Sequence, residues 1–306
     1  MIFMKFLLFS DLHHGPGIFD GGTYEDLEIF NRAAKSSGCD FIIHAGDLFQ
    51  GEPASYDFVR KYNSLDVPTY HCLGNHDTDE SSYDDVLALY NMPNNYYYFD
   101  CGGYRIVILD PNYMYLDGEY VHYSLRNYYH KHPIRDYIPP QQLEWLEETL
   151  DSSPYPAIII SHESIERHAD GLKNRADVLE VINRANKKHP GRVLAAFNGH
   201  YHRDYTRLLD GVLYMDVNSA SFDYISYAHD KFPKEMRESM TEVDHTLIYN
   251  DPLYAIITLE GNTITVDGVE SSFFMGVDSA VSGNPPYDKD ARPATAKISS
   301  LKVALG

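Results

Sequence analysis

Five short motifs rich in histidine, aspartate and asparagine occur in the first two thirds of the chain, and each follows a predicted strand. They are Asp11-Leu12-His13, Gly46-Asp47, Gly74-Asn75-His76-Asp77, Ser161-His162 and Gly199-His200-Tyr201-His202. Imidazole is the commonest metal ligand in proteins, and carboxylates suit hard divalent ions. If the motifs converge in space, they form a site of mixed nitrogen and oxygen ligands for a first-row metal.

The placement of these motifs after strands favours their convergence. Ligand sites of open α/β sheets lie beyond the carboxyl ends of the strands. Residues two apart in an extended segment point the same way, so we expect Asp11 and His13 to face one cluster, and likewise His200 and His202. A single G-D or S-H pair is usually a turn with a satisfied polar side chain. Only the five motifs taken together predict a metal site.

Three further histidines have other expected roles. His14 points the opposite way from His13 along an extended chain, which places it at the rim of the site rather than among the ligands. His44 and His71 lie inside predicted strands and are expected to be hydrogen-bonded core residues.

The elements that must position the motifs alternate between short β-rich runs and helical patterns, which predicts an α/β fold of mixed layers. The predicted strands are 5–10, 41–45, 69–73, 104–109, 157–161, 193–197, 213–217, 254–259 and 263–266. A first helix is predicted after Thr23, with Asp26 in its first turn. The apolar stripes of three predicted helices are Leu27, Phe30 and Ala34, then Leu143, Leu146 and Leu150, then Ala176, Leu179 and Ile182.

The length of 306 residues, with 43% hydrophobic and 23% charged residues, is that of an ordinary globular protein with a substantial core. We expect a single domain over residues 1–275, with insertions over its rim at 111–139 and 221–252. Residues 276–306 are rich in Ser, Pro and Gly and are expected to form an extended tail on the surface.

The charge balance restricts the partners. Lys and Arg number 25 against 45 Asp and Glu, a formal net charge of −20, so the surface should repel phosphate polymers such as duplex nucleic acid. No run approaches the roughly 18 apolar residues of a membrane-spanning helix. The start MIFMKFLLFS has no small-residue cleavage site, and the three cysteines are scattered, so we expect a cytoplasmic protein with buried free thiols. The oligomeric state is not indicated.

The order of the motifs, D-x-H, G-D, G-N-H-D, a lone H after a strand and G-H-x-H, resembles the calcineurin-like metallophosphoesterase family from position 11 to 202. The resemblance implies a β-sandwich flanked by helices, with two divalent metal ions at the strand ends. The first metal would be held by Asp11, His13 and His202, and the second by Asn75, His162 and His200. Asp47 would bridge the two.

Differences from relatives narrow the subclass. Purple acid phosphatases carry a Tyr three residues after the bridging Asp, where this chain has Gln50. Protein Ser/Thr phosphatases carry an Arg shortly after G-N-H-E, whereas Thr78, Asp79 and Glu80 follow here. The chain is more similar to the bacterial branch that holds cyclic-nucleotide phosphodiesterases, including its run Tyr98-Phe99-Asp100.

The chemistry that the resemblance implies is phosphoester hydrolysis. Two metals about 3.5–4 Å apart lower the pKa of a bridging water toward ~7 and supply a metal-bridging hydroxide for in-line attack. The resemblance assigns His76 to contact the phosphate and protonate the leaving oxygen, and Asp77 to orient the His76 ring. Mn²⁺ is the expected metal, with Fe or Zn as alternatives, because such a ligand set accepts several first-row ions.

The expected substrate is a small phosphodiester or phosphomonoester of nucleotide type. Eleven of the 26 tyrosines lie between positions 96 and 137, and rings on a loop over a phosphate site could stack on a nucleobase. The expected substrate contacts are Tyr113, Tyr123, Tyr128, Arg126 and His14. The tyrosines could equally pack within the insertion and stiffen it.

Two other functions stay open. A pyrophosphatase for ADP-ribose-type nucleoside-diphosphate conjugates would use the same metal core and differ in its insertions. A non-catalytic protein-binding scaffold is the other, although all eight family positions assigned as ligands or acid are intact.

Overall fold

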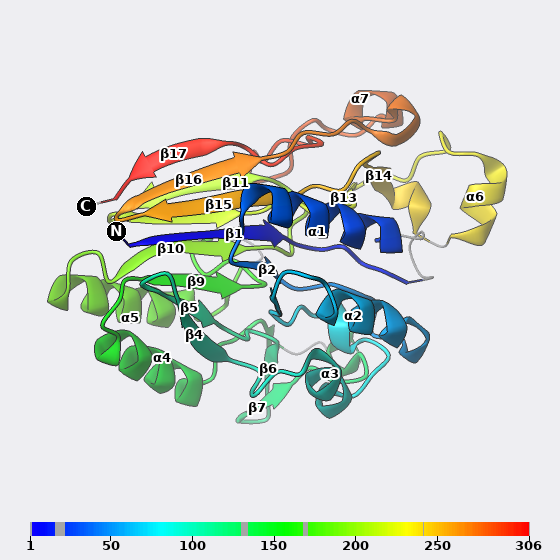
Figure 1. Cartoon of the computed structure of the whole chain (residues 1–306). Helices are drawn as coiled ribbons and strands as arrows, with labels where there is room; N and C mark the ends of the chain where they lie inside the picture. Colours follow the sequence, from blue (N-terminus) through cyan, green and yellow to red (C-terminus); the bar gives the residue numbers. More distant parts are fainter. Residues whose placement is uncertain (1, 16–21, 130–133, 168–170, 241, 306) are drawn as a thin grey trace.

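The structure is a computed structural model that describes residues 2–15, 22–129, 134–167, 171–240 and 242–305. Two six-stranded sheets pack face to face and form a sandwich (Figure 1). The first sheet has the order β17 (Leu301–Ala304), β16 (Thr263–Gly268), β15 (Ala255–Glu260), β1 (Phe3–Phe9), β2 (Phe41–His44) and β3 (Thr69–Tyr70). The second has the order β11 (Tyr205–Leu209), β12 (Val212–Asp216), β10 (Val193–Asn198), β9 (Ala157–Ser161), β5 (Tyr104–Ile108) and β4 (Tyr97–Cys101).

The central strands of both sheets are buried on both faces, which explains their nearly continuous apolar sequences. Between the sheets, the Phe6 ring stacks on Phe41 at 4.9 Å within the first sheet. It also meets the edge of Phe197 from the second sheet, with a centroid distance of 6.4 Å. The main core of the protein therefore lies between the two sheets.

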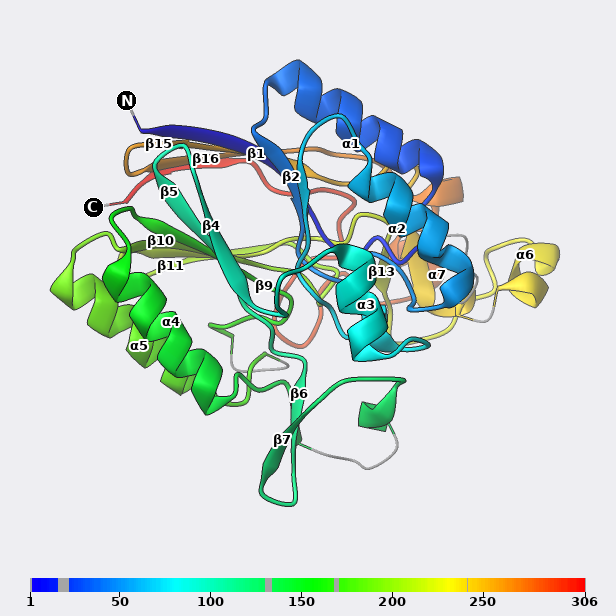
Figure 2. The same ribbon diagram turned by 60° about the horizontal axis from the view of Figure 1, so that its bottom comes forward.

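Helices cover the outer faces of the sandwich (Figure 2). The first sheet is covered by α1 (Tyr24–Ser37), α2 (Tyr56–Asn63) and α3 (Tyr83–Tyr90). The second is covered by α4 (Pro140–Ser152) and α5 (Arg175–Lys188). The expected β-sandwich flanked by helices is thus confirmed.

The start of α1 follows from its sequence. The Thr23 hydroxyl accepts the Asp26 amide proton, and the Asp26 carboxylate accepts that of Thr23, so two otherwise unpaired donors are satisfied. The stripe predicted for α5 was partly wrong, since Ala176 is exposed. The buried face of α5 consists of Val178, Val181, Ile182 and Ala185.

The two predicted insertions carry secondary structure of their own. Residues 111–139 contain a three-stranded sheet of β6 (Tyr113–Leu116), β7 (Glu119–His122) and β8 (Ile134–Arg135), with the 3₁₀ turn Asn127–Tyr129. Residues 221–252 contain β13 (Phe222–Tyr224), α6 (Lys234–Ser239), the 3₁₀ turn Val243–His245 and β14 (Thr246–Ile248). The other short 3₁₀ turns are Pro53–Ser55, His76–Thr78 and Phe274–Gly276.

The C-terminal segment does not only extend over the surface, as expected, but also adds a strand and core residues to the fold. After the short helix α7 (Ser279–Ser282), its strand β17 pairs antiparallel with β16 and forms an edge of the first sheet. Ala296, Ile298 and Leu305 are buried in the main core. The last residues of the chain are therefore part of the sandwich.

His44 and His71 are core residues joined in a line of hydrogen bonds, as expected. His44 Nδ1 accepts the Gly46 amide proton at 3.2 Å, so the ring proton is on Nε2, which lies 2.8 Å from His71 Nδ1. His71 Nε2 in turn donates to Asn63 Oδ1 at 2.6 Å. Burial lowers the pKa of His44 to about 3, so the line stays neutral.

Two further expectations can be compared with the structure. Among the described residues, no helix is long and apolar enough to cross a membrane. Cys39, Cys72 and Cys101 are all free thiols, as expected. The expectation that all three are buried is wrong, because only Cys72 is buried and the other two are partly exposed.

Candidate dinuclear metal centre

The five motifs meet at one end of the sandwich. Asp11 and Asp47 follow the parallel neighbours β1 and β2, while His162 and His200 follow the parallel neighbours β9 and β10 of the other sheet. Contacts between the loops join the two sheets here. His162 Nδ1 lies 2.7 Å from the Ala45 carbonyl oxygen, and the His200 amide donates to both carboxylate oxygens of Asp11 at 3.1 and 3.0 Å.

The structure gathers two adjacent groups of potential ligands. They are Asp11, His13 and His202, and Asp47, His162 and His200, with the ligand atoms of each group within 4.8 Å of one another. In the first group, His202 Nε2 lies 3.1 Å from His13 Nε2 and 3.3 Å from Asp11 Oδ1. All three side chains are buried. They form a compact set of two nitrogens and one oxygen.

In the second group, His162 Nε2 lies 3.3 Å from His200 Nδ1 and 3.1 Å from Asp47 Oδ2. The same Asp47 oxygen lies 3.7 Å from His13 Nε2 in the first group. Asp47 Oδ1 accepts the amide proton of His76 at 2.8 Å, which leaves Oδ2 facing both groups. Asp47 thus has the position of a bridging carboxylate.

The backbone at these residues corrects one expectation. Five of the ligands have positive φ angles between 52° and 72° and are not extended; they are Asp11, His13, Asp47, His200 and His202. The left-handed conformation is uncommon for residues other than glycine and is typical of functional sites. The side chains converge because the loops turn sharply after each strand, not because alternate residues of a strand face one way.

Two glycines allow the loops to approach the ligands closely. A Cβ at Gly199 would lie 1.8 Å from Ser10 Oγ and 2.7 Å from Asp11 Oδ2. A Cβ at Gly74 would lie 2.2 Å from Asp47 Oδ1. Any larger residue at either position would displace a carboxylate of the centre.

Backbone carbonyl oxygens place a proton on Nδ1 of two candidate ligand histidines, His202 and His162. His202 Nδ1 lies 2.8 Å from the Phe222 carbonyl oxygen, and a carbonyl only accepts, so the proton is on Nδ1 and the Nε2 lone pair is available. His162 is fixed in the same way by Ala45. For His13, the neighbour of Nδ1 is the amide nitrogen Nε2 of Gln50, at 2.9 Å. Binding of a metal through His13 Nε2 requires the amide of Gln50 to turn so that its oxygen accepts from Nδ1.

The ionisation states also suit metal binding. Burial, followed by the neighbouring His162, lowers the pKa of His200 to about 3, and burial likewise holds the pKa of His13 well below its ordinary value. Burial alone would raise the pKa of Asp47, but His162 and His76 outweigh it and lower the pKa. Neutral imidazoles beside ionised carboxylates are the forms in which these groups act as ligands. His162 differs, because burial is outweighed by Asp47 and Asp11, which raise its pKa well above the ordinary value. His162 would therefore release a proton when it binds a metal through Nε2.

Asn75 supplies a further indication that the site fits a metal. Its Oδ1 is buried and has no hydrogen-bond partner among the described residues, whereas its Nδ2 donates to the Tyr128 hydroxyl at 3.2 Å. An unpaired buried amide oxygen is costly unless a partner completes it. A divalent cation next to the second group would be such a partner.

The role expected of Asp77, orienting the His76 ring, belongs to Asp79. His76 Nδ1 lies 2.8 Å from Asp79 Oδ2, so Asp79, not Asp77, orients the ring. The Asp77 carboxylate instead accepts the Tyr90 hydroxyl proton and backbone amide protons, including those of Asp47 and Gly74. Asp77 therefore organises the loop that carries the bridging aspartate. The expectation for Asp77 failed because adjacent residues in a 3₁₀ turn point in different directions.

Tyr123 and Tyr128 are buried, at 1% and 2% exposure, which corrects their expected role as stacking platforms. Their rings stack on each other with a centroid distance of 4.5 Å. The Tyr123 hydroxyl donates to Asp136 at 2.7 Å, and the Tyr128 hydroxyl donates to Asp79 at 2.6 Å. Tyr128 therefore contacts both Asn75 and Asp79 from behind the centre.

The other expected substrate contacts lie in different places. Tyr113 is half-buried, and its hydroxyl accepts from Asn95 at 2.9 Å. Arg126 is half-exposed and lies 3.2 Å from Asp79, beside the centre. The His14 ring stacks on Phe58 of α2 at 3.7 Å, away from the two ligand groups.

Three residues near the centre were not predicted. Asp79 orients His76, Gln50 contacts His13, and Tyr224 lies with its ring 4.8 Å from that of His202. Asp79 could have been found, because position i+3 in a turn is within reach of residue i. Tyr224 could not, since it belongs to a strand whose position depends on the fold.

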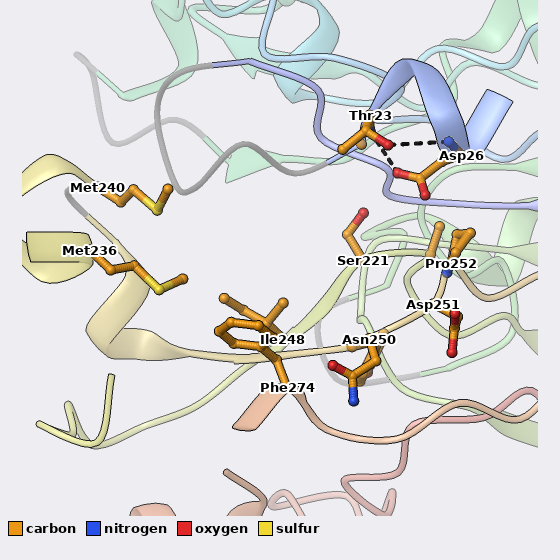
Figure 3. A pocket seen from close by; sticks show the side chains of 13 residues that line it. Thr23, Asp26, Ser221, Met236, Met240, Ile248, Asn250, Asp251, Pro252 and Phe274 are labelled. Atoms are coloured by element: carbon orange, nitrogen blue, oxygen red, sulfur yellow. Dashed lines mark hydrogen bonds between the residues drawn. The ribbon is translucent and has the colours of Figure 1, made fainter. Parts of the chain in front are cut away.

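A cavity of about 250 Å³ lies beside the 221–252 insertion (Figure 3). Met236, Met240, Ile248 and Phe274 form its apolar side, and Thr23 and neighbouring residues form the other. None of its lining residues is a predicted metal ligand. The two methionines pack against the small core of this insertion.

A helix-flanked double sheet with two adjacent groups of carboxylate and imidazole ligands at one end defines a protein of the dimetal phosphoesterase class. Residues 4–204 match the family model described as calcineurin-like phosphoesterase, and the chain belongs to this family. A comparison with curated proteins found no match.

Two solved structures share the fold. A dimetal phosphatase from Danio rerio is 14% identical with a TM-score of 0.65, and the alignment covers 99% of each chain. GAP50, described as the anchor in the inner membrane complex of Plasmodium, is 12% identical with a TM-score of 0.57, covering 100% of this chain and 90% of that one. At these identities the likeness concerns the fold alone.

Proposed function

We propose that this protein is a metal-dependent phosphoesterase that hydrolyses a small, nucleotide-like phosphodiester or phosphomonoester. The observation that carries the proposal is the pair of ligand groups with Asp47 Oδ2 facing both. Two bound divalent ions would supply a nucleophile from water and neutralise the phosphoryl oxygens. Mn²⁺ is the proposed metal, with Fe or Zn as alternatives.

The protein's own part in the reaction is to bind, orient and protonate. His76 lies next to the ligand groups, with its ring 5.2 Å from the His13 ring, and its side chain is partly exposed. The Asp79 carboxylate accepts a hydrogen bond from His76 Nδ1, so His76 Nε2 is the atom that would deliver a proton to the leaving oxygen. Burial alone would lower the pKa of His76, but Asp47 and Asp79 outweigh it and raise the pKa, which favours the acid form.

The proposed substrate is small because the protein carries a net charge of −20. Such a charge disfavours a phosphate polymer as partner, whereas a small ester can reach the end of the sandwich where cations would be bound. The likeness of its motifs to the bacterial cyclic-nucleotide phosphodiesterase branch supports a nucleotide-type ester. The scaffold alternative is disfavoured by the intact set of ligands, since a binding module does not require them.

The test is hydrolysis of p-nitrophenyl phosphate and bis-p-nitrophenyl phosphate by protein loaded with Mn²⁺. We expect turnover of at least one ester, and its loss by a factor of about 100 or more in Asp47→Asn. Asp57→Asn is the matched control, because Asp57 is an exposed aspartate of α2 paired only with Arg60 among the described ion pairs. Absence of turnover on both esters, or equal activity of the two variants, would contradict the proposal.

A further inference from the structure

A second cavity, of about 420 Å³, lies between the loop of the metal ligands, β13 and the C-terminal segment. Its volume is within the range of small-molecule sites, roughly 300–1,000 Å³. Three tyrosines and two arginines line much of it, namely Tyr201, Tyr224, Tyr287, Arg203 and Arg292. Nothing in the expected chemistry of the motifs uses this cavity.

The cavity shares a wall with the metal centre. Tyr201 stands between the ligands His200 and His202, and its ring lies 5.2 Å from that of His200. Tyr224 packs with its ring 4.8 Å from the His202 ring. A group bound in the cavity would thus lie beside residues that contact the candidate ligands His200 and His202.

The two arginines of the cavity are already paired with carboxylates. Both carboxylate oxygens of Asp223 accept from Arg203 Nε at 3.0 Å. Arg292 Nε donates to Asp288 at 2.5 Å, and its guanidinium plane lies 3.8 Å from the centre of the Tyr201 ring. Because both buried guanidinium groups have carboxylate partners, they offer flat faces for stacking rather than free donors for a second phosphate. Lys289 is a further cation in the lining.

We propose that this cavity binds the planar, uncharged heteroaromatic group of the substrate, a nucleobase. Tyrosine rings and the face of a stacked guanidinium are surfaces on which bases stack. The identity of the linked phosphoester rests on the proposed function, but binding of the base itself does not. The outer wall of the cavity is Tyr287, which is 58% exposed and comes from the C-terminal segment.

The first experiment measures adenosine and ribose binding to metal-free protein by calorimetry. We expect adenosine to bind and ribose not to bind. Tyr287→Ala should weaken adenosine binding by a factor of about 5 or more, whereas Tyr287→Phe should retain it because the ring provides the stacking surface. Tyr227→Ala is the matched control, since Tyr227 is 64% exposed on the neighbouring segment but does not line the cavity.

The second experiment compares adenosine monophosphate with ribose 5-phosphate as inhibitors of p-nitrophenyl phosphate hydrolysis. Adenosine monophosphate should inhibit more strongly, and the difference should disappear in Tyr287→Ala and persist in Tyr227→Ala. Failure of adenosine to bind, or equal binding by Tyr287→Ala and the wild type, would overturn the inference. Absence of any ester hydrolysis together with intact adenosine binding would refute the proposed function and leave the base site standing.

Discussion

Asp79 occupies the position from which a carboxylate can fix the tautomer of a histidine acid. It accepts from His76, from the Tyr128 hydroxyl and, at 3.2 Å, from the half-exposed Arg126. The side chain is buried, so these contacts hold it in one orientation. Its contribution to the reaction should therefore be the placement of the His76 ring.

Replacing Asp79 should affect esters according to their leaving groups. In Asp79→Asn, kcat for an alkyl ester such as glycerol phosphate should fall by roughly 10- to 100-fold, because an alkoxide must be protonated as it leaves. Hydrolysis of p-nitrophenyl phosphate should change little, since nitrophenolate leaves without a proton. Steady-state assays of both esters measure this difference in the loss of kcat.

Glu80→Gln is the control for this prediction, because Glu80 is the exposed neighbour of Asp79. An equal loss on both esters would assign Asp79 to metal binding or folding instead of to the placement of the acid.

At the scale of elements, the 111–139 insertion forms hydrogen bonds to residues next to the candidate metal centre. Its residue Tyr128 bridges Asn75 and Asp79, and Tyr123 holds the insertion together through Asp136. The insertion had been expected to contact substrate. The structure indicates that it positions one ligand and the carboxylate behind the acid.

This role predicts the effect of Tyr128→Phe. Without the hydroxyl, the Asn75 amide and the Asp79 carboxylate each lose one hydrogen bond. The affinity for Mn²⁺ should therefore fall by about 10-fold, as for other residues that orient ligands. The KM of a nucleotide relative to that of p-nitrophenyl phosphate should not change. Metal titration and paired KM values are the measurements.

Tyr115→Phe serves as the matched control, because Tyr115 lies in the same insertion and is exposed. A selective rise in the nucleotide KM of Tyr128→Phe would restore the stacking role and contradict the burial seen here.

The central strands could be predicted from sequence because they are buried on both faces and read as apolar runs. Each of the nine predicted strands has a counterpart, although the strand predicted at 69–73 is reduced to Thr69–Tyr70. Strands such as β6, β7 and β13 were missed. They are short, β6 and β7 are largely half-exposed, and β13 has only three residues. Their β structure depends on packing against neighbouring segments rather than on a pattern of their own.

The convergence of the candidate ligand residues could be predicted because metal chemistry restricts their types and the strand ends place them together. The residues that orient them could not be assigned as well. Asp77 and Asp79 are both aspartates near His76, and only the turn decides which carboxylate faces the ring. The residues that line the second cavity could not be predicted either, since Tyr201, Tyr224 and Tyr287 are far apart in sequence.

For the whole molecule, the metal centre is a junction between the two sheets. His13 and Asp47 come from the first sheet, and His162 and His202 from the second. Bound ions would therefore connect the two halves of the sandwich. Any ligand that binds only the folded state also stabilises it by mass action.

We expect Mn²⁺ to raise the melting temperature of the metal-stripped protein. At a concentration 100 times its dissociation constant, one ion should add about 2.7 kcal/mol of stability. Asp47→Asn should show a much smaller increase, since the replaced oxygen faces both ligand groups. Differential scanning calorimetry with and without Mn²⁺ checks this, and Mg²⁺-free buffer with a chelator provides the baseline. An identical increase in the variant would place the stabilising ions elsewhere.

The pairing of β1 with β15 has a consequence for how the protein is made. Every predicted ligand precedes residue 203, yet β15 begins only at Ala255. A nascent chain that has just emerged as far as His202 carries all the metal-binding side chains, while one edge of β1 has no partner. Completion of the first sheet must therefore wait for synthesis of β15. Until then, the open edge is free to pair with other chains, so a pause in translation between these regions would expose the protein to aggregation.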